Sequence, residues 1–448
     1  MYLRADAEGV PFPPKRTFWP PPRPRVGSSG PRPHVRDLGH LRPILRDGML
    51  ESYRKWAIEQ DGKDYVIWAG PTPHLVVAEP SSALQVVQGG AFVRNVGPTE
   101  ALFGKGLLRL EGKPWVDRRT LFADAFRGKG LAPALPIIQE EVARLIHDWS
   151  PRREAFKPNR DLSSFMFRVL SRFLFGIELD EQRYGGQPLH RALATLATQS
   201  VLEHLFPPTL VRLRTQRQVE EARRWLDAVC EMIYEKGGNT VFLGALRGAV
   251  ARQQFPRSTA IDEIRSFLIA GHETSATALS WSIAQLALHD DQTEPVVAEA
   301  SRTLSQPDEV NGLVNTLRWS KETMRLYPPV PLHVAQAAKR TRLGRFEVPA
   351  GTRVDVCSYV LHRLPQLWHE PEKFAPERFS SSPAPGTWMP FLLGPHTCLG
   401  LKLAMLELPL AIAGLAGAFR FRLPKGPPKV NLRLSLHPAD FWIALTPR

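Results

Sequence analysis

Residues Phe391 to Gly400 have the sequence FLLGPHTCLG, which places one of only three cysteines between two glycines, just before a pattern of helical periodicity. Two interpretations of Cys398 compete. A free cysteine is often a small buried hydrophobe. Alternatively, Cys398 is a metal-binding thiolate, and Gly394 and Gly400 give the backbone close approach and unusual dihedral angles around the sulfur. Backbone N–H groups can then point at the sulfur, Phe391 can shield it, and the following helix start favours the ionised thiol.

The composition indicates a large folded protein without a disulfide framework. The chain has 448 residues, of which 43% are hydrophobic and 23% are charged, so it can bury a substantial core. Cys230, Cys357 and Cys398 are widely spaced, which fits a reducing cytosol. The first ten residues contain no secretory signal, and no 18-residue window is uninterruptedly apolar. We therefore expect a cytoplasmic protein without a transmembrane anchor.

The formal net charge of +14 raises the question of nucleic-acid binding. However, the basic residues are scattered and interleaved with acids, without a motif of aromatic and basic residues that would bind nucleic acid. A docking face for an acidic protein accounts for the charge at least as well. We expect no nucleic-acid partner.

The distribution of residue types predicts a proline-rich arm followed by one large domain. Residues 11–33 are dense in proline and arginine, and proline at that density cannot sustain a helix. We therefore assign an arm to residues 1–40 and the domain to residues 41–448. Residues 64–80 predict a β-hairpin, and a strand-like pattern returns at residues 345–362. From roughly residue 100 to residue 300, apolar residues recur mostly at helical spacing. The predicted fold class is mainly α with small β-sheets (α+β).

A run from Ser258 to His289 predicts one long buried helix, with Ser258 or Thr259 as its N-cap. Its centre, AGHETSAT, is unusually polar for a buried helix, and it carries a glycine that costs about 1 kcal/mol there. One interpretation is a polar patch satisfied within the core. The other is a site where Gly271 lets a flat ligand approach while Glu273 and Thr274 supply an acid and an alcohol for proton transfer.

Two further motifs are weak by themselves. Glu322 and Arg325 lie three residues apart on a predicted helix that stops at Pro328, and such a pair is usually a solvated surface feature. The irregular stretch WHEPEKFAPERF, residues 368–379, offers Arg378.

Taken together, these stretches resemble, in order and spacing, the cytochrome P-450 superfamily of heme-thiolate monooxygenases of the soluble bacterial type. The family's cysteine loop, F-x-x-G-x-R/H-x-C-x-G, is matched by Phe391, Gly394, His396, Cys398 and Gly400. The long-helix signature A/G-G-x-E/D-T-T/S is matched by Ala270, Gly271, Glu273, Thr274 and Ser275. The remaining motifs, E-x-x-R, P-E-R-F and W-x-x-x-R, are matched by Glu322 and Arg325, by Pro376 to Phe379, and by Trp115 and Arg119.

The resemblance implies a role for each matched residue. Cys398 is the axial ligand of heme b, and a thiolate ligand pushes electron density toward iron and favours O–O cleavage. Glu273 and Thr274 handle protons during activation of O2, and Ala270 and Gly271 lie against the distal face of the porphyrin. The remaining implied groups are a structural ion network of Glu322, Arg325 and Arg378, and a set that holds the heme propionates, namely Trp115, Arg119 and His396.

Two positions depart from the family pattern. His396 stands where arginine is more common. The strand after Pro331 has Ala335 where the family usually places an arginine that binds a propionate, and no arginine follows until Arg340. His333 either compensates or forms a wall of the substrate pocket. We therefore expect weaker heme anchoring than is usual, and tighter heme retention in Ala335→Arg.

The resemblance also implies a pocket for a lipophilic substrate such as a terpenoid, fatty acid, steroid or polyketide, as in secondary metabolism. The loop Phe92–Leu107 and residues 202–211 complete this pocket. Each pocket residue could equally be ordinary core. The individual residues expected to line it are Phe267, Ile269, Val330, Leu332 and His333.

The sequence contains no flavin or iron–sulfur motif, so NAD(P)H-derived electrons must come from another protein. We expect a ferredoxin or flavodoxin, with its reductase, to dock on a basic patch of a monomeric enzyme. Charge reversal of Arg118 and Arg127 would test this. The patch consists of Lys105, Arg109, Lys113, Arg118, Arg127 and Lys129.

The leading functional prediction is C–H hydroxylation or epoxidation. One alternative is the same fold acting as an isomerase, a dehydratase or a peroxide-driven enzyme. Another is a catalytically idle heme-binding partner module. The first alternative would dispense with the acid–alcohol pair, and an idle module would be expected to lose that pair or E-x-x-R. Glu273, Thr274, Glu322 and Arg325 are all present.

Overall fold

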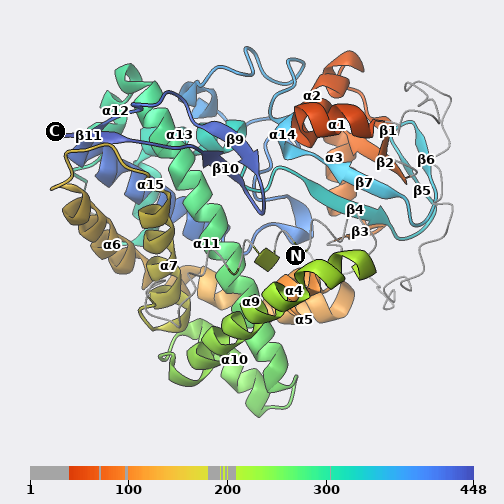
Figure 1. The fold of residues 1–448 in the computed structure, drawn as a ribbon, viewed down its shortest axis with the longest axis horizontal. Helices are drawn as coiled ribbons and strands as arrows, with labels where there is room; N and C mark the ends of the chain where they lie inside the picture. Colours follow the sequence, from red (N-terminus) through yellow and green to blue (C-terminus); the bar gives the residue numbers. More distant parts are fainter. Residues whose placement is uncertain are drawn as a thin grey trace. The chain divides into compact units, whose positions relative to one another are not determined.

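The structure is a computed structural model, and Figure 1 shows its ribbon. It describes residues 40–69, 72–95, 99–179, 192, 195–196, 199, 208–302 and 304–448. The chain forms two compact units that alternate along the sequence. Unit 1 comprises Met1–Val96, Glu111–Lys113 and Met324–Cys398, and unit 2 comprises Gly97–Leu110, Pro114–Thr323 and Leu399–Arg448. The predicted arm lies outside the described residues except for His40.

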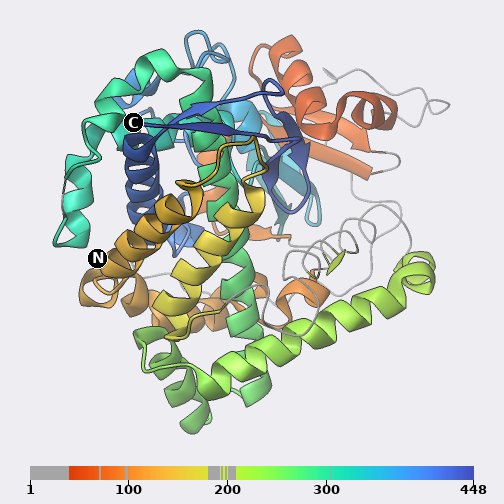
Figure 2. The ribbon, with the colours of Figure 1, turned by 60° about the vertical axis from the view of Figure 1, so that its left-hand side comes forward.

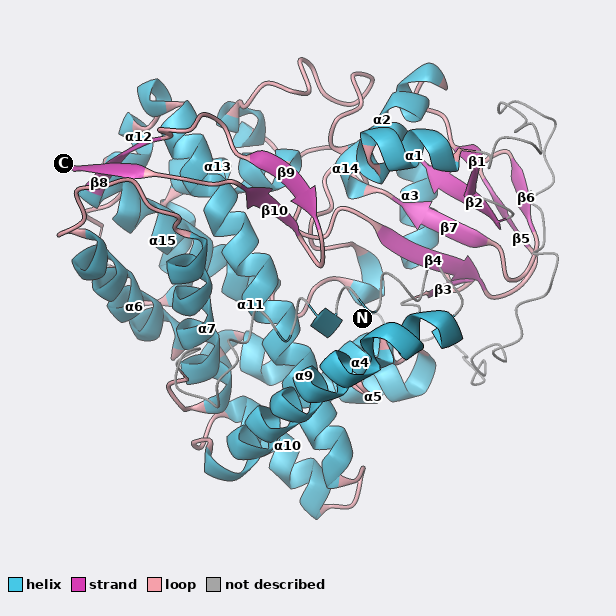
Figure 3. Cartoon of the chain, viewed as in Figure 1, coloured by secondary structure: helices cyan, strands magenta, loops and turns pink. Residues whose placement is uncertain are grey.

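Unit 1 is built on a five-stranded sheet with the strand order β1-β2-β7-β4-β3. β1 (Tyr65–Ala69) and β2 (Thr72–Val77) form an antiparallel pair, which confirms the predicted hairpin. β7 (Arg353–Val356) runs parallel to β2, and β4 (His333–Ala337) and the edge strand β3 (Phe92–Arg94) complete the sheet in antiparallel pairs. Figure 3 shows these strands in magenta. Apolar side chains of β2, β4 and β7 form the core of this unit.

The other elements of unit 1 are short. The strand-like pattern at residues 345–362 is confirmed for β6 (Phe346–Val348) and β7 but not beyond Val356, because Ser358–Leu361 forms a single helical turn, α14. A short apolar run carries no periodicity that separates strand from helix. The remaining elements of unit 1 are α1 (Leu41–Asp47), α2 (Met49–Glu59), α3 (Pro80–Gln88), β5 (Thr341–Leu343), β6 (Phe346–Val348), η6 (Pro376–Ser380) and η7 (Gly394–His396).

Unit 2 is mainly helical and is organised around α11 (Arg257–Leu288), which packs against α7 (Asn159–Phe175), α9 (Pro208–Lys236) and α15 (Leu401–Ala418) (Figure 2). Two small antiparallel pairs accompany the helices, β8 (Phe419–Arg422) with β11 (Ala444–Pro447), and β9 (Lys429–Leu432) with β10 (Leu436–Ala439). The other helices are α4 (Glu100–Phe103), α5 (Gly112–Ala123), α6 (Ala134–Trp149), α7 (Asn159–Phe175), α9 (Pro208–Lys236), α10 (Val241–Ala251), α12 (Glu294–Val297), α13 (Val314–Leu326) and α15 (Leu401–Ala418). The start of α5, up to Lys113, and the end of α13, from Met324, belong to unit 1. The 3-10 turns are η1 (Leu107–Arg109), η2 (Asp124–Phe126), η3 (Gly128–Gly130), η4 (Asp290–Gln292) and η5 (Pro307–Gly312).

The long helix predicted for residues 258–289 is confirmed, since α11 spans Arg257–Leu288 and most of its side chains are buried. The predicted cap is wrong. Pro256 occupies the N-cap position without a side-chain hydrogen bond, and Ser258 and Thr259 lie inside the first turn. A cap must have non-helical dihedral angles, and the extended backbone of Pro256 already supplies them.

Within the described residues, α15 is the one helix long and apolar enough to cross a membrane by length and composition. However, 56% of its apolar window is buried in the structure. It packs against α6, α11 and α12, which is typical of a core helix.

Candidate heme-thiolate site

Cys398 differs in exposure from the other two cysteines. Cys230 and Cys357 are fully buried, and burial raises the pKa of each thiol to about 12. Cys398 is exposed and lies three residues before α15 begins at Leu401. The interpretation of Cys398 as a small buried hydrophobe is therefore excluded. A thiol that is accessible and close in sequence to a helix N-terminus suits ligation.

The loop before Cys398 has a backbone that requires glycine at one position. Gly394 has φ +73, and a Cβ placed there would lie 2.9 Å from the carbonyl oxygen of Val87. The N–H of Cys398 donates to the carbonyl oxygen of Phe391 at 2.8 Å and closes the loop. The unusual dihedral expected at Gly400 is wrong, since its φ is −80. Gly400 is instead the N-cap of α15, a position where glycine is common.

Arg325 is fully buried and donates to backbone carbonyls at 2.7 Å (His362), 2.7 Å (Pro371) and 3.1 Å (Lys373). Glu322, one turn earlier on α13, is also fully buried. The interpretation of this pair as a solvated surface feature is therefore excluded.

Arg378 contacts the same irregular segment. Its guanidinium donates to the carbonyl oxygen of Glu370 at 2.9 Å, within the stretch whose carbonyls Arg325 binds. The two arginines thus fix the backbone of a segment that has no regular secondary structure of its own to satisfy its carbonyl groups.

His362 is a supporting residue that the sequence analysis missed. It is fully buried, its Nδ1 lies 3.1 Å from the carbonyl oxygen of Arg325, and its Nε2 lies 2.9 Å from the N–H of Met389. Burial lowers the pKa of His362 to about 3, so the ring is neutral at pH 7. The network assigns Nδ1 as donor and Nε2 as acceptor. His362 thereby links the end of α13 to the start of the cysteine loop.

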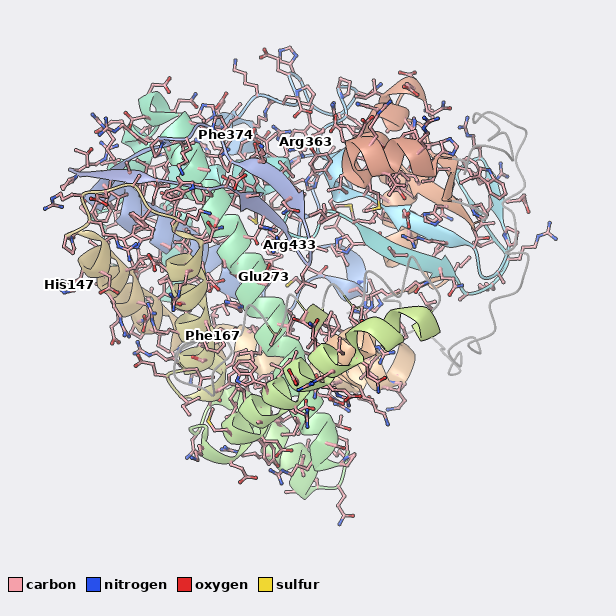
Figure 4. The ribbon with its side chains drawn as sticks, in the orientation of Figure 1. His147, Phe167, Glu273, Arg363, Phe374 and Arg433 are labelled. Atoms are coloured by element: carbon pink, nitrogen blue, oxygen red, sulfur yellow. The ribbon has the colours of Figure 1, made fainter. Side chains whose placement is uncertain are left out.

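At the centre of α11, the predicted acid and alcohol have separate partners. The hydroxyl of Thr274 donates to the carbonyl oxygen of Ala270 at 2.7 Å. Oε1 of Glu273 accepts from the hydroxyl of Ser435 at 2.8 Å, and Ser435 shares a second hydrogen bond of 2.7 Å with Thr277. Neighbouring residues on a helix face different directions. In Figure 4, Glu273 is labelled on α11 and Arg433 in the turn between β9 and β10 that also carries Ser435.

The other polar groups of the AGHETSAT segment are satisfied inside unit 2. Ser275 donates to Glu407 of α15, and His272 shares a hydrogen bond with Ser163 of α7. A Cβ on Gly271 would lie 2.7 Å from Cδ1 of Leu170. Close packing of α11 on α7 is therefore sufficient reason for glycine here, and its contact with a flat ligand stays a prediction.

Residues expected to hold the propionates occur in both units. In unit 2, Trp115 is buried, and the guanidinium of Arg119 lies 5.4 Å from the centroid of its ring, one turn along α5. In unit 1, Nε2 of His396 lies 3.4 Å from Oε2 of Glu111. Glu111 also accepts from Nε of Arg94 at 2.6 Å. The sequence analysis missed Glu111 and Arg94, which no motif signals.

The predicted pocket residues have mixed environments, and their role in a pocket stays a prediction. Ile269 is buried, and Val330, Leu332 and His333 are half-buried. Phe267 packs in an aromatic cluster with Phe122, Phe126 and Phe242 at centroid distances of 5.0, 5.8 and 4.7 Å. Of the two segments that were expected to complete the pocket, residues 96–98 and 202–207 lie outside the described residues.

The basic patch expected to dock a redox partner needs a correction. Lys105, Lys113, Arg127 and Lys129 are exposed. Arg118, in contrast, donates to the fully buried Glu263 at 2.6 Å and stacks on Phe255. Its charge is used inside unit 2, so Arg118 is unsuited to docking.

The residues present in unit 1 fit a heme. They supply an exposed thiol in a closed loop, the cationic Arg94 and the titratable His396 close to one another, and His333, whose buried Nε2 has no hydrogen-bond partner among the described residues. A thiolate suits iron, and cationic groups suit the carboxylates of a porphyrin.

Comparison with known proteins agrees with this chemistry. Residues 29–441 match the family described as Cytochrome P-450. A Streptomyces melanosporofaciens protein named cyclooctat-9-en-7-ol 5-monooxygenase is 27% identical over 446 residues, covering 93% of this chain and 94% of its own. A cytokinin hydroxylase of Arabidopsis thaliana is 25% identical and covers 93% of this chain and 92% of its own. A putative cytochrome P-450 137 of Mycobacterium tuberculosis is 29% identical over 72% of this chain and 68% of its own.

The family match extends over most of the chain, and relatives that match nearly end to end are named as a monooxygenase and a hydroxylase. The protein is thus an oxidoreductase of the heme monooxygenase class. The mainly α fold with small sheets, predicted from the sequence, is the fold of this family. The chain belongs to the cytochrome P-450 family.

Proposed function

We propose that this protein inserts one oxygen atom from O2 into a lipophilic small molecule by hydroxylation or epoxidation, with heme b bound through Cys398. The observation that carries the proposal is the state of Cys398, the one exposed cysteine among the three, in a loop closed by its own N–H on Phe391. The fixed backbone of Gly394 and the helix start at Leu401 prepare this thiol for ligation.

When bound, the heme supplies the activation of dioxygen, and the residues of this chain bind and orient the reactants. In unit 1, Arg325 and His362 hold the backbone before the cysteine loop and keep the loop in a single conformation. In unit 2, the carboxylate of Glu273 accepts a hydrogen bond from the hydroxyl of Ser435, which orients it. The hydroxyl of Thr274 donates a hydrogen bond to the carbonyl oxygen of Ala270. The oxygen of this hydroxyl therefore acts toward the reactants as an acceptor of a proton or a hydrogen bond.

The substrate class rests on two kinds of support. The predicted pocket residues are mostly apolar, and the relative from Streptomyces melanosporofaciens is named for oxidation of an unsaturated alcohol. We infer that the substrate is a terpenoid, fatty acid, steroid or polyketide, as in secondary metabolism. We further propose that the protein is a cytoplasmic monomer and that it takes NAD(P)H-derived electrons from a ferredoxin or flavodoxin and its reductase.

The absorption spectrum of the reduced, carbon-monoxide-bound protein tests the proposal. We expect a strongly red-shifted Soret band, since thiolate ligation donates electron density to the iron. Cys398→Ser should lose this band, while Cys230→Ser, which changes a buried cysteine elsewhere in the chain, should keep it. Absence of heme in the native protein, or a band of the histidine-ligated kind, would contradict the proposal.

A further inference from the structure

The strand next to β4 carries an arginine directly opposite the position where the family's arginine is missing. β3 and β4 are antiparallel, and Arg94 pairs with Ala335 in the register. Residues that lie directly opposite each other project from the same face of the sheet, with Cβ atoms about 5 Å apart. The side chain of Arg94 therefore starts beside the point from which an arginine at position 335 would start.

Glu111 holds Arg94 and His396 at one carboxylate. Its Oε1 accepts from Nε of Arg94 at 2.6 Å and lies 3.4 Å from the backbone nitrogen of the same residue. Its Oε2 lies 3.4 Å from Nε2 of His396, two residues before Cys398. All three side chains are largely buried. Glu111 thus orients a guanidinium and an imidazole, the two kinds of group that bind carboxylates, next to the cysteine loop.

His333 cannot supply the missing positive charge. It lies two residues from Ala335 on β4 and so projects from the same face as Ala335 and Arg94. Burial, and secondly the charge of Arg94, lower the pKa of His333 to about 4, so the ring is neutral at pH 7. Among these three residues, Arg94 is the one that carries charge.

We propose that Arg94 binds the heme propionate that the family's arginine at the Ala335 position would bind, and that Glu111 positions both Arg94 and His396 for this contact. The guanidinium reaches the propionate from β3 instead of β4. This inference rests on the heme binding of the proposed function. It replaces the weaker heme anchoring that we expected from Ala335 alone.

The proposal reverses one prediction made from the sequence. Ala335→Arg should no longer tighten heme retention, because a second guanidinium would stand directly opposite Arg94, and like charges opposite each other destabilise a strand pair. We expect this variant to lose heme at the rate of the native protein or faster.

Transfer of heme from the holoprotein to an excess of apomyoglobin tests the proposal. Arg94→Gln should release heme roughly tenfold faster, the effect of losing one hydrogen bond to a charged group. In Arg94→Gln/Ala335→Arg, where the guanidinium has moved to the neighbouring strand, the rate should return to within about threefold of the native rate. Arg342→Gln, which changes an exposed arginine of the same unit on β5, should leave the rate unchanged.

Two results would overturn the proposal. One is release of heme from Arg94→Gln at the native rate. The other is a double variant that releases heme as fast as Arg94→Gln, because Arg94 would then act only through the folding of its surroundings. The carbon monoxide spectrum of the native protein separates these outcomes from failure of the proposed function, since it reports thiolate ligation whatever holds the propionates.

Discussion

At the scale of single residues, burial gives Glu407 a property that its sequence position does not suggest. The carboxyl group is buried on α15 and accepts a hydrogen bond from the hydroxyl of Ser275. Burial raises the pKa of Glu407 to about 7, although the hydrogen bond from Ser275 acts in the opposite direction. The folded protein therefore holds this proton more tightly than the unfolded chain does, where the ordinary value is 4.5.

The stability of Glu407→Gln relative to the native protein should accordingly depend on pH. The contribution of the native carboxyl is fully present below pH 4.5 and is lost as the pH rises through 7, so the variant gains relative stability over this window. The full gain is about 3 kcal/mol, from 1.36 kcal/mol for each pKa unit. Urea unfolding at pH 5 and pH 8 measures most of this gain, with the exposed Glu377→Gln as control. A constant difference between the two pH values would contradict the prediction.

Ser435 is expected to affect proton handling through Glu273. Loss of the hydroxyl in Ser435→Ala should raise the fraction of reducing equivalents released as hydrogen peroxide by about threefold, the value of one hydrogen bond. It should also change the solvent isotope effect on turnover, while heme content and substrate binding stay the same. The structural reason is that the hydroxyl of Ser435 donates a hydrogen bond to the Glu273 carboxylate and so orients it.

Two variants control this experiment. Ser435→Thr keeps the hydroxyl and should behave as the native enzyme. Thr277→Val removes the other partner of Ser435 and leaves its bond to Glu273. If Glu273→Gln uncouples the enzyme and Ser435→Ala does not, then Ser435 has no part in orienting the carboxylate.

At the scale of elements, Glu263 is one of the residues through which α11 connects to segments that precede it in the chain. Glu263 on α11 accepts from Arg118 of α5 at 2.6 Å and from the N–H of Leu107 at the start of η1 at 3.0 Å. Burial raises the pKa of Glu263 to about 7, although both hydrogen bonds and the charge of Arg118 act to lower it. Burying the Arg118–Glu263 ion pair therefore costs desolvation energy, and removing one partner would leave the other charge buried without its counter-charge.

Arg118→Gln should lower the free energy of unfolding by about 3 kcal/mol, because it leaves a buried carboxylate without its cation. Thermal or urea unfolding near pH 8, where Glu263 is ionised, measures the loss. Arg127→Gln is the matched control, since the pair that Arg127 forms with Asp124 is exposed. Equal stability of the two variants would show that Arg118 and Glu263 contribute no more than a surface pair.

At the scale of the whole molecule, the formal charge of +14 suits association with an acidic redox partner. Lys105, Arg127 and Lys129 are exposed basic residues of unit 2 that lie close to α5 in the sequence. We expect Arg127→Glu/Lys129→Glu to slow reduction by a ferredoxin or flavodoxin at low salt by about tenfold and to flatten its dependence on ionic strength.

The internal role of Arg118 makes it unsuitable for this test, because its charge reversal would place two carboxylates together. The control is instead Arg217→Glu on α9, an exposed arginine of the same unit in another segment. A native reduction rate and an unchanged salt dependence in the double variant would exclude this face as the docking surface.

The local patterns of the sequence predicted much of the fold and part of the candidate site. The α11 helix, the β1–β2 hairpin and the unusual dihedral angle of Gly394 follow from residue types and their spacing along the chain. Helix and strand periods and turn geometry are local properties. The helix cap and the dihedral at Gly400 were predicted wrongly, because several neighbouring residues are compatible with each role.

Other features depended on segments that meet only in the folded chain. Ser435 lies 162 positions from Glu273, and no motif joins them. The register that sets Arg94 opposite Ala335, and the use of Glu111 and His362 as supports, arise in the same way.

By itself the sequence determined the family and the positions of the long helix and the hairpin, and it singled out Cys398 as the cysteine proposed to bind heme. These depend on which residues stand at short fixed spacings, and a covalent chain preserves such spacings in any conformation. Only the tertiary structure decided which polar groups are buried and what each one contacts. It turned Arg118 inward to Glu263, set Ser435 against Glu273 and placed Arg94 beside Ala335. Burial and partnership fix the charge, orientation and pKa of a side chain, and both are properties of the packed molecule.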